Sequence, residues 1–235
     1  MESTLKNGSF ERVIAIADIH GCYIILRQLL EEEIRFEPCK DKIIFLGDYI
    51  DFRKMSDAVD RSGVSSAKVV QYVSELKRMH PDNIVLLKGN HEAMAEKAFT
   101  SDNPIDQHQW SMNGGMETII SYGGFERAAE VLLPFIKTLE LYHETSEAIF
   151  VHGGLPSDKT IFEASEDEML WNRGKYVGKK LLVVGHSITD SVRMIGNKLN
   201  IDLGCFMTGR LVGFDVLSRK IYEATGQKSG IKHND

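Results

Sequence analysis

The sequence contains little cysteine. Its 235 residues include three, Cys22, Cys39 and Cys205, which are scattered and form no CxxC pair. An odd, unpaired set excludes a disulfide framework, and the missing spacing excludes a cysteine-ligated zinc site. This pattern predicts a reducing, cytoplasmic location.

Long apolar runs and an excess of positive charge are also missing. The longest apolar runs, such as KLLVVG at 180–185, are far too short to span a bilayer, and the polar start MESTLKNGSFER has no signal core. We therefore expect no membrane partner. The net charge of −6 argues against duplex nucleic acid as a partner. The oligomeric state stays undetermined by the sequence.

Short β-branched runs alternate with helical patterns in the first half of the chain, and strands dominate the second half. We expect strands at 12–17, 42–46, 83–87, 139–145, 148–154, 180–187, 198–204, 210–216 and 220–224. We expect helices at 23–34, 64–79, 92–99 and 125–139, the last despite Pro134. This order predicts one α/β domain with two sheets packed face to face and covered by helices. The pattern weakens at about 102–124, which we interpret as an insertion outside the core.

Five of the expected strands end in side chains that can bind a metal ion. These are Asp18 with His20, Asp48 with Asp51, Asn90 with His91 and Glu92, His152, and His186. Taken singly, each has an ordinary structural explanation, such as a capped turn or a buried histidine. In open α/β sheets, however, sites form outside the carboxyl ends of strands, so these donors are expected to converge.

The donor set indicates the metal chemistry. Mixed oxygen and nitrogen ligands suit manganese, iron or zinc, and the number of donors is too high for one metal with open positions. Two ions sharing one carboxylate would use the full set. Two metals about 3.5–4 Å apart are a common device for phosphoester hydrolysis, because they activate a water and hold the phosphate oxygens.

Five motifs in this order carry a resemblance to a known family. They are DIHG (18–21), GDYID (47–51), GNHE (89–92), VHGG (151–154) and VGHS (184–187). Together they resemble the phosphoprotein phosphatase (PPP) family of calcineurin-like metallophosphoesterases, and in particular small bacterial and phage serine/threonine phosphatases. The resemblance implies a single metallophosphoesterase domain over 1–235, with a β-sandwich of two mixed sheets flanked by helices (αββα).

The resemblance also implies roles for individual residues. One metal ion would be held by Asp18, His20 and Asp48, and the other by Asp48, Asn90, His152 and His186. His91 resembles the general acid of the family, and Asp51 resembles the carboxylate that orients and charges its ring. The implied cofactors are two divalent ions, with manganese as the first choice and iron or zinc as alternatives.

The loop after Asp51 departs from the family pattern. Phe52 and Arg53 stand where the family has Arg followed by Gly, and that Arg binds the substrate phosphate. Arg53 replaces it in one interpretation, and in a second Arg173 of LWNR (170–173) binds the phosphate largely alone. In a third, the substrate differs and Phe52 forms an apolar wall. In a fourth, Phe52 simply packs under the loop. We assign Arg173 and Arg53 as candidate substrate-binding residues.

These features support two functions of different substrate class. The leading hypothesis is a metal-dependent serine/threonine protein phosphatase, whose substrate is a phosphorylated protein or a small phosphoester. The alternative is a dinucleoside polyphosphate hydrolase similar to diadenosine tetraphosphatases. A non-catalytic phosphopeptide-binding protein is a remote third hypothesis, since all six metal ligands and both members of the acid pair are present.

Overall fold

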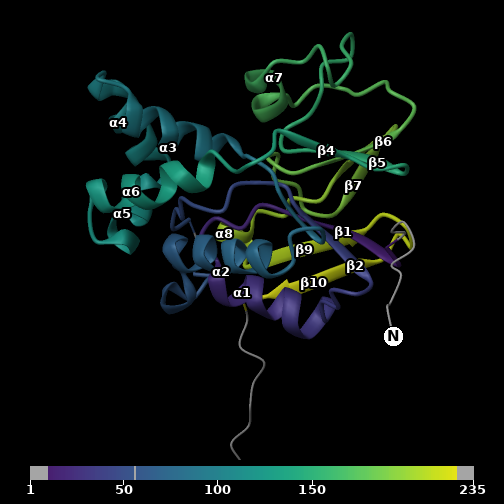
Figure 1. Ribbon diagram of the computed structural model, residues 1–235, viewed down its shortest axis with the longest axis horizontal. Coiled ribbons are helices and arrows are strands. Elements are labelled where there is room, and N and C mark those ends of the chain that lie inside the picture. The colour runs from purple at the N-terminus through teal and green to yellow at the C-terminus, as the bar shows by residue number, and fades with distance from the viewer. Residues whose placement is uncertain (1–9, 56, 227–235) are drawn as a thin grey trace, which may run out of the picture.

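Two five-stranded sheets form the centre of the molecule (Figure 1). The computed structural model describes residues 10–55 and 57–226, so the polar N-terminal segment judged to lack a signal core lies largely outside it. In the first sheet the strand order is β10-β9-β1-β2-β3, and in the second it is β4-β5-β6-β8-β7. Both sheets are mixed, which confirms the predicted fold class.

The strands follow the expected order along the chain. The first sheet contains β1 (Arg12–Ile16), β2 (Asp41–Phe45), β3 (Ile84–Leu86), β9 (Arg210–Asp215) and β10 (Ile221–Thr225). The second contains β4 (Tyr142–Glu144), β5 (Ala148–Val151), β6 (Leu181–Val184), β7 (Arg193–Ile195) and β8 (Lys198–Asn200). The exposed strand β7 was not predicted, because its three residues carry no apolar face towards the core.

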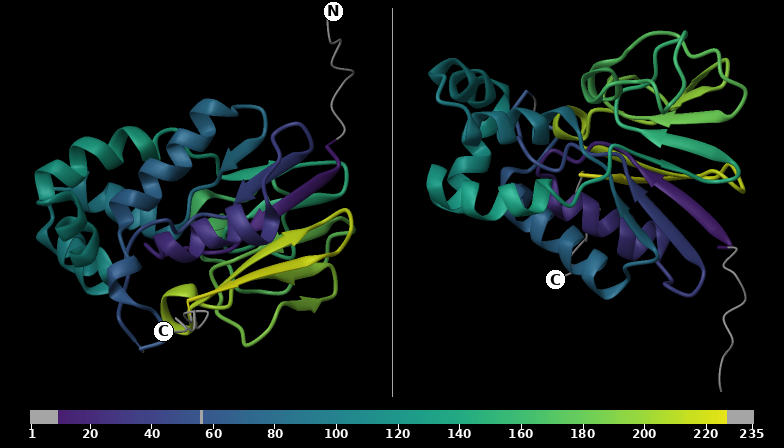
Figure 2. Two further views of the ribbon diagram at one scale, coloured as in Figure 1. Left: turned by 90° about the horizontal axis from the view of Figure 1, so that it is seen from below. Right: turned by 45° about the horizontal axis from the view of Figure 1, so that its top comes forward.

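Helices cover the outer sides of the sandwich. The helices are α1 (Tyr23–Gln28), α2 (Ser66–Met79), α3 (Asn90–Thr100), α4 (Pro104–Trp110), α5 (Met116–Tyr122), α6 (Phe125–Ile136), α7 (Glu166–Trp171) and α8 (Cys205–Thr208). The π-helical turns η1 (Leu29–Ile34) and η3 (Ser111–Gly115) continue α1 and α4, and η2 (Arg61–Gly63) is a 3₁₀ turn. Helices α1 and α2 lie outside the first sheet, while α3 to α6 gather at one end of the sandwich (Figure 2). No helix in the described ranges is long and apolar enough to cross a membrane.

The apolar core has two parts because β5 and β6 are buried on both faces. Ala148 and Phe150 of β5 join the main core between the sheets, whereas Ile149 and Val151 face a smaller cluster. That cluster also contains Met169 of α7. Alternating residues of β5 thus pack into two different apolar clusters. Because both faces of the strand are buried, its sequence is a continuous apolar run.

The parallel strands bring the predicted donors to one edge of each sheet. In the register of the first sheet, Ile16 pairs with Phe45, and Phe45 with Leu86. The candidate ligands of this half lie in the loops that follow β1 and β2 and, after β3, at Asn90, the first residue of α3. In the second sheet, His152 and His186 follow β5 and β6, which pair in parallel. Donors from both sheets therefore meet at the same end of the sandwich.

The segment predicted as an insertion is mostly helical rather than irregular. It forms α4, η3 and α5, and it packs against α3 and α6. Two of its side chains, Trp110 and Thr118, are fully buried. The expectation that this segment lies outside the core is therefore wrong for these residues. The paired glycines and the kink at Gly114 hide the helical periodicity.

Candidate active site

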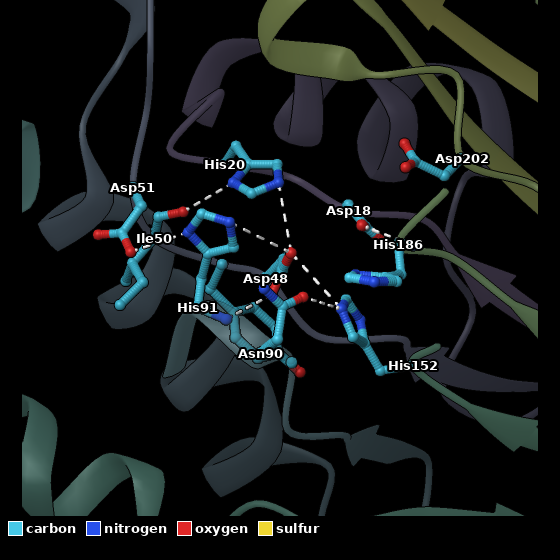
Figure 3. Close-up of polar contacts among 12 residues, drawn as sticks. Asp18, His20, Asp48, Ile50, Asp51, Asn90, His91, His152, His186 and Asp202 are labelled. Carbon is cyan, nitrogen blue, oxygen red and sulfur yellow. Dashed lines mark hydrogen bonds and ion pairs between the residues drawn. The ribbon is translucent and has the colours of Figure 1, made fainter. Parts of the chain in front are cut away.

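The other five predicted ligands gather around the Asp48 carboxylate (Figure 3). Asp48 Oδ2 lies 3.4 Å from Nε2 of His20 and 3.5 Å from Nε2 of His152. Nε2 of His152 also lies 2.8 Å from Oδ1 of Asn90. All of these side chains are buried. The loops after β1, β2, β3 and β5 thus bring their polar side chains to one point.

Backbone carbonyls orient two of the imidazole rings. Nδ1 of His20 lies 3.0 Å from the carbonyl oxygen of Ile50, and Nδ1 of His152 lies 2.9 Å from that of Leu46. A carbonyl accepts a hydrogen bond, so the proton is on Nδ1 in both rings. Each Nε2 therefore presents its lone pair to the site, the usual arrangement of a metal-binding histidine.

Asp18 and His186 supply two further buried donors without partners. Oδ1 of Asp18 and Nε2 of His186 have no hydrogen-bond partner among the described residues. The other carboxylate oxygen of Asp18 accepts a hydrogen bond of 2.8 Å from the backbone N–H of His186. A Cβ on Gly185 would lie 2.0 Å from Oδ1 of Asp18, so only glycine permits this approach. Unpartnered buried polar atoms are costly, and a bound cation would satisfy both.

Two groups of side chains are close enough to hold metal ions. The first is His20, Asp48 and His91, and the second is Asp48, His152 and His186; within each group the ligand atoms lie within 4.8 Å of one another. Asp48 belongs to both groups, as expected for a bridging ligand. The first group contains His91 where the sequence predicts Asp18. Assignment of His91 as acid and Asp18 as ligand therefore stays a prediction.

His91 and Asp51 form a close pair beside this cluster. Nδ1 of His91 lies 2.9 Å from Oδ2 of Asp51, and Nε2 of His91 points towards Asp48 at 4.0 Å. Burial raises the pKa of Asp51 to about 8 and lowers the pKa of His91 to about 4. Burial therefore opposes the charged ring that the family resemblance implies, and in the metal-free chain it favours the neutral forms of both groups.

Burial has the same effect on the candidate ligands. It lowers the pKa of His20 and of His186 to about 3 and raises the pKa values of Asp18 and Asp48 well above the usual range. The histidines are therefore neutral and able to coordinate a metal ion. The carboxyls need a nearby cation in order to ionise fully.

Glu92 organises the loop that carries Asp48, a role that we did not assign from the sequence. Its side chain is fully buried and accepts hydrogen bonds from the backbone N–H groups of Asp48, Tyr49 and Gly89 at 2.8–2.9 Å. Gly89 is the N-cap of α3. Glu92 thus joins the β2 loop to the start of α3. Its position in GNHE was the only signal in the sequence.

Asp202 is a second residue whose role we did not predict. It follows β8, is buried, and lines the same cleft as Asp18. Asp202 contributes to raising the pKa of Asp18 through repulsion between the two carboxylates. Its place after a parallel strand was the available signal.

The backbone is strained where the site residues lie. Six described residues other than glycine have a positive φ, and four belong to this site: His20 (47°), Asp48 (52°), Asp51 (70°) and His186 (64°). Such conformations are unfavourable for side chains with a Cβ and cluster at functional sites.

A cleft of about 320 Å³ opens onto these residues. Arg53 and Arg173 both line it, with Trp171, Ile188 and Phe206 among the apolar residues of its wall. A larger cavity of about 420 Å³ beside α1 contains none of the predicted site residues.

Phe52 does not line the cleft. Its side chain is only 4% exposed and belongs to the main apolar core. The interpretation of Phe52 as a wall for the substrate is therefore wrong, because an inward-facing loop position buries the ring. The fourth interpretation, packing under the loop, is the one observed.

Comparisons with known proteins agree with this geometry. Residues 11–207 match the family described as calcineurin-like phosphoesterase. Serine/threonine-protein phosphatase 2 of Salmonella typhimurium is 26% identical over 229 residues, covering 90% of this chain and 96% of the relative. The symmetrical bis(5'-nucleosyl)-tetraphosphatase of Methylococcus capsulatus is 27% identical, covering 85% of this chain and 68% of the relative.

A solved structure supports the fold. The structure of a protein serine/threonine phosphatase from Saccharomyces cerevisiae superposes with a TM-score of 0.66 at 18% identity, covering 97% of this chain and 83% of that one. The family match covers most of the chain and includes all five motifs, so the resemblance seen in the sequence is confirmed. The chain belongs to the calcineurin-like phosphoesterases and is a metallophosphoesterase hydrolase.

Proposed function

We propose that this protein is a serine/threonine protein phosphatase that depends on two divalent metal ions. The observation that carries the proposal is the His91–Asp51 pair, at 2.9 Å, directly beside donors centred on Asp48. An acid next to a metal-binding cluster fits hydrolysis of a phosphomonoester, in which an alcohol must leave with a proton. The similarity to serine/threonine-protein phosphatase 2 supports the choice of substrate.

The proposed ligands are those expected from the sequence. Asp18, His20 and Asp48 would hold one ion, and Asp48, Asn90, His152 and His186 the other. When bound, such ions activate a water molecule and neutralise charge on the phosphate. Oxygen and nitrogen donors without cysteine suit manganese, iron or zinc, and manganese is our first choice among them.

The side chains of the protein would perform the remaining work. His91 would donate a proton from its ring to the leaving oxygen. The ionised Asp51 carboxylate, 2.9 Å from Nδ1 of His91, would hold the ring in position and favour the protonated form that burial opposes in the metal-free chain. Arg173 and Arg53 line the cleft and bind the phosphate. Arg173 forms no ion pair with any described residue, so its guanidinium is available, and its proximity contributes to the lowered pKa of His186.

Hydrolysis of dinucleoside polyphosphates is the second candidate function. The relative from Methylococcus capsulatus carries that name, and the apolar wall of the cleft offers Trp171 and Phe206 as surfaces for a base. Cleavage of the phosphoanhydride bond releases a nucleotide through a phosphate oxygen, and this leaving group depends less on protonation by an acid than an alcohol does.

One assay panel tests the proposal. The metal-free protein is loaded with manganese and assayed on an aryl phosphate, on phosphoserine, phosphothreonine and phosphotyrosine peptides, and on a dinucleoside tetraphosphate. We expect the highest kcat/KM among the peptides to be on phosphoserine or phosphothreonine. The variant His91→Asn is compared with His108→Asn, because His108 is exposed and lies outside the cleft lining.

The outcomes separate the candidate functions. A clear preference for the dinucleotide would replace the leading proposal by the second. Full activity after chelation, with absence of metal verified by elemental analysis, would contradict metal dependence itself.

A further inference from the structure

The carboxylate of Asp51 is held by two side chains besides His91. The indole Nε1–H of Trp110 donates to Oδ2 of Asp51 at 2.7 Å, on the same oxygen that faces His91. The hydroxyl of Thr118 donates to Oδ1 of Asp51 at 2.7 Å. Asp51, Trp110 and Thr118 are all buried. Both carboxylate oxygens therefore have a fixed donor that does not come from the catalytic loops.

These donors come from the helical segment at 104–122. Trp110 ends α4, and Thr118 lies in the first turn of α5. Gly114, between them, has φ = +107°, and a Cβ there would lie 2.8 Å from the backbone oxygen of Asp51. The chain can therefore pass directly over Asp51 only because this position is glycine. Trp110, Gly114 and Thr118 of this segment thus all lie close to Asp51.

Further contacts fix the segment to the same loop. The Thr118 hydroxyl accepts a hydrogen bond of 3.0 Å from the backbone N–H of Asp51. Next to it, Glu117 accepts a hydrogen bond from the hydroxyl of Ser66 at the start of α2. The Trp110 ring packs edge-on against Phe99 of α3 at 4.9 Å between centroids. The positions of the Trp110 indole and the Thr118 hydroxyl are therefore fixed by contacts of their segment with α3 and with the start of α2.

We propose that Trp110 and Thr118 are positioning residues that fix the Asp51 carboxylate, and through it the His91 ring, for proton donation to the leaving group. The inference rests on the proposed role of His91 as general acid. Neither residue lines the cleft, and both are fully buried, so they act on the reaction through Asp51 rather than on the substrate. Their effect is to prevent rotation of the carboxylate about its χ2 angle. A rotated carboxylate would leave the ring without its partner, and Nε2 would lose its direction towards the cleft.

This role predicts an effect that depends on the leaving group. A phenolate with a nitro group leaves readily without a proton, whereas an unsubstituted phenolate needs one. Loss of the acid's alignment therefore slows hydrolysis of phenyl phosphate much more than that of para-nitrophenyl phosphate. A general loss of folded or metal-loaded protein would lower both rates equally.

The kinetic test uses Thr118→Val and Trp110→Phe in the manganese-loaded protein. Thr118→Val keeps the shape of the side chain and removes the hydroxyl, and Trp110→Phe keeps an aromatic ring and removes the N–H. We expect each variant to lower kcat on phenyl phosphate about tenfold, which corresponds to one hydrogen bond to a charged group. On para-nitrophenyl phosphate we expect less than about a twofold change, and KM stays constant for both substrates.

Matched variants control for a structural effect. Thr118→Ser keeps the hydroxyl and should restore most of the activity lost in Thr118→Val. Ser121 lies on the same helix, where its hydroxyl accepts a hydrogen bond from the backbone N–H of Ala67 in α2 and donates one to the backbone carbonyl of Thr118. Ser121→Ala removes both hydrogen bonds without touching Asp51, so it should not change the ratio of the two rates. Adding Thr118→Val to His91→Asn should cause no further loss on phenyl phosphate, because the acid is already gone.

A readout that needs no activity comes from the indole N–H signals. The sequence contains two tryptophans, and Trp171 is 42% exposed, so it serves as an internal reference. In ¹H–¹⁵N spectra we expect the Trp110 indole proton to exchange slowly with solvent and to shift when Asp51→Asn is introduced. The Trp171 signal should do neither.

The combined results decide the proposal. Equal losses on both substrates, or a Trp110 signal that Asp51→Asn does not move, would overturn it. A wild-type protein with no phosphatase activity but with the expected indole signal would overturn the proposed function and leave the hydrogen bonds to Asp51 in place.

Discussion

Asp48 has three imidazole nitrogens within 4.0 Å of one carboxylate oxygen. An ion pair with any of these rings would stabilise it, but burial lowers the pKa values of His20 and His91 to about 3 and about 4. In the metal-free chain these rings are therefore neutral near pH 7. A buried carboxylate with neutral nitrogen neighbours is arranged for an added cation rather than for a salt bridge within the protein.

The His91–Asp51 pair gives the first prediction at the scale of single residues. We expect Asp51→Asn and His91→Asn each to lower kcat on a substrate with a poor leaving group by roughly 10²–10⁴-fold, the usual value of general acid catalysis. Metal content, measured by elemental analysis, should stay that of the wild type. Loss of metal in His91→Asn alone would instead identify His91 as a ligand, in agreement with its place in the first metal-binding group.

The two cleft arginines give the second prediction. A hydrogen bond to a charged group contributes about 1.5–3 kcal/mol. Arg173→Ala should therefore lower kcat/KM roughly 10- to 150-fold. A similar loss in Arg53→Ala would indicate that both arginines bind the phosphate. No loss in Arg53→Ala would leave Arg173 as the main side-chain contact, and no loss in either variant would contradict both assignments.

At the scale of elements, the start of α3 depends on one carboxylate. Both carboxylate oxygens of Glu92 accept hydrogen bonds from backbone N–H groups, three in all. Glu92→Gln would replace one of these oxygens by an NH₂ group, which cannot accept a hydrogen bond from the N–H that it faces. We expect the free energy of unfolding to fall by about 1–3 kcal/mol. We also expect weaker manganese binding, because Asp48 is held by the same contacts. Urea unfolding and calorimetric titration measure the two effects.

Glu96→Gln is the matched control for this prediction. Glu96 lies on the same helix but is partly exposed and pairs with Lys88 rather than with the Asp48 loop. A change as large as that of Glu92→Gln in manganese affinity would contradict the role given to Glu92.

Helices and strands with a clear periodicity of apolar residues were predictable from the sequence, and elements without that periodicity were not. The apolar runs at 42–46 and 148–154 correspond to β2 and β5, and the donors after them lie together as expected. The π-helical turn η1 was included in a single helix at 23–34, because its apolar positions continue the helical pattern. Trp110 and Thr118 gave no signal, since their partner Asp51 is more than fifty positions away and only the tertiary fold brings them together.

At the scale of the whole molecule, metal removal is expected to make stability depend on pH. Burial raises the pKa values of the carboxyls at the site: Asp18 and Asp48 well above the usual range, Asp202 to about 6, Glu92 to about 7 and Asp51 to about 8. Unfolded acids titrate near pH 4 and unfolded histidines near pH 6.5, so above about pH 7.5 the metal-free folded chain binds more protons than the unfolded chain. Its stability therefore falls as the pH rises.

The measurement compares Tm with and without manganese between pH 7.5 and 8.5. The contribution of the histidines, whose pKa values are lowered in the folded chain, is nearly constant in this range because unfolded rings, with a pKa of about 6.5, are almost all neutral there. We expect the difference in Tm to widen as the pH rises, since the ions neutralise the carboxylates. A difference that stays constant or narrows would contradict the proposed ligand set.

The division of the ligands between two sheets has a consequence for folding kinetics. Asp18, His20, Asp48 and Asn90 follow strands of the first sheet, whereas His152 and His186 follow strands of the second. The first proposed ion takes its ligands from one sheet, but the second needs Asp48 and Asn90 from one sheet and His152 and His186 from the other. The complete two-metal site is therefore expected to bind tightly only after the sheets have docked. Manganese should then slow unfolding and leave the refolding rate almost unchanged. Stopped-flow measurements against denaturant, with and without the metal, would give both the folding and the unfolding rates. The ions would then stabilise the native state after the transition state has been passed, rather than help to form the folding nucleus.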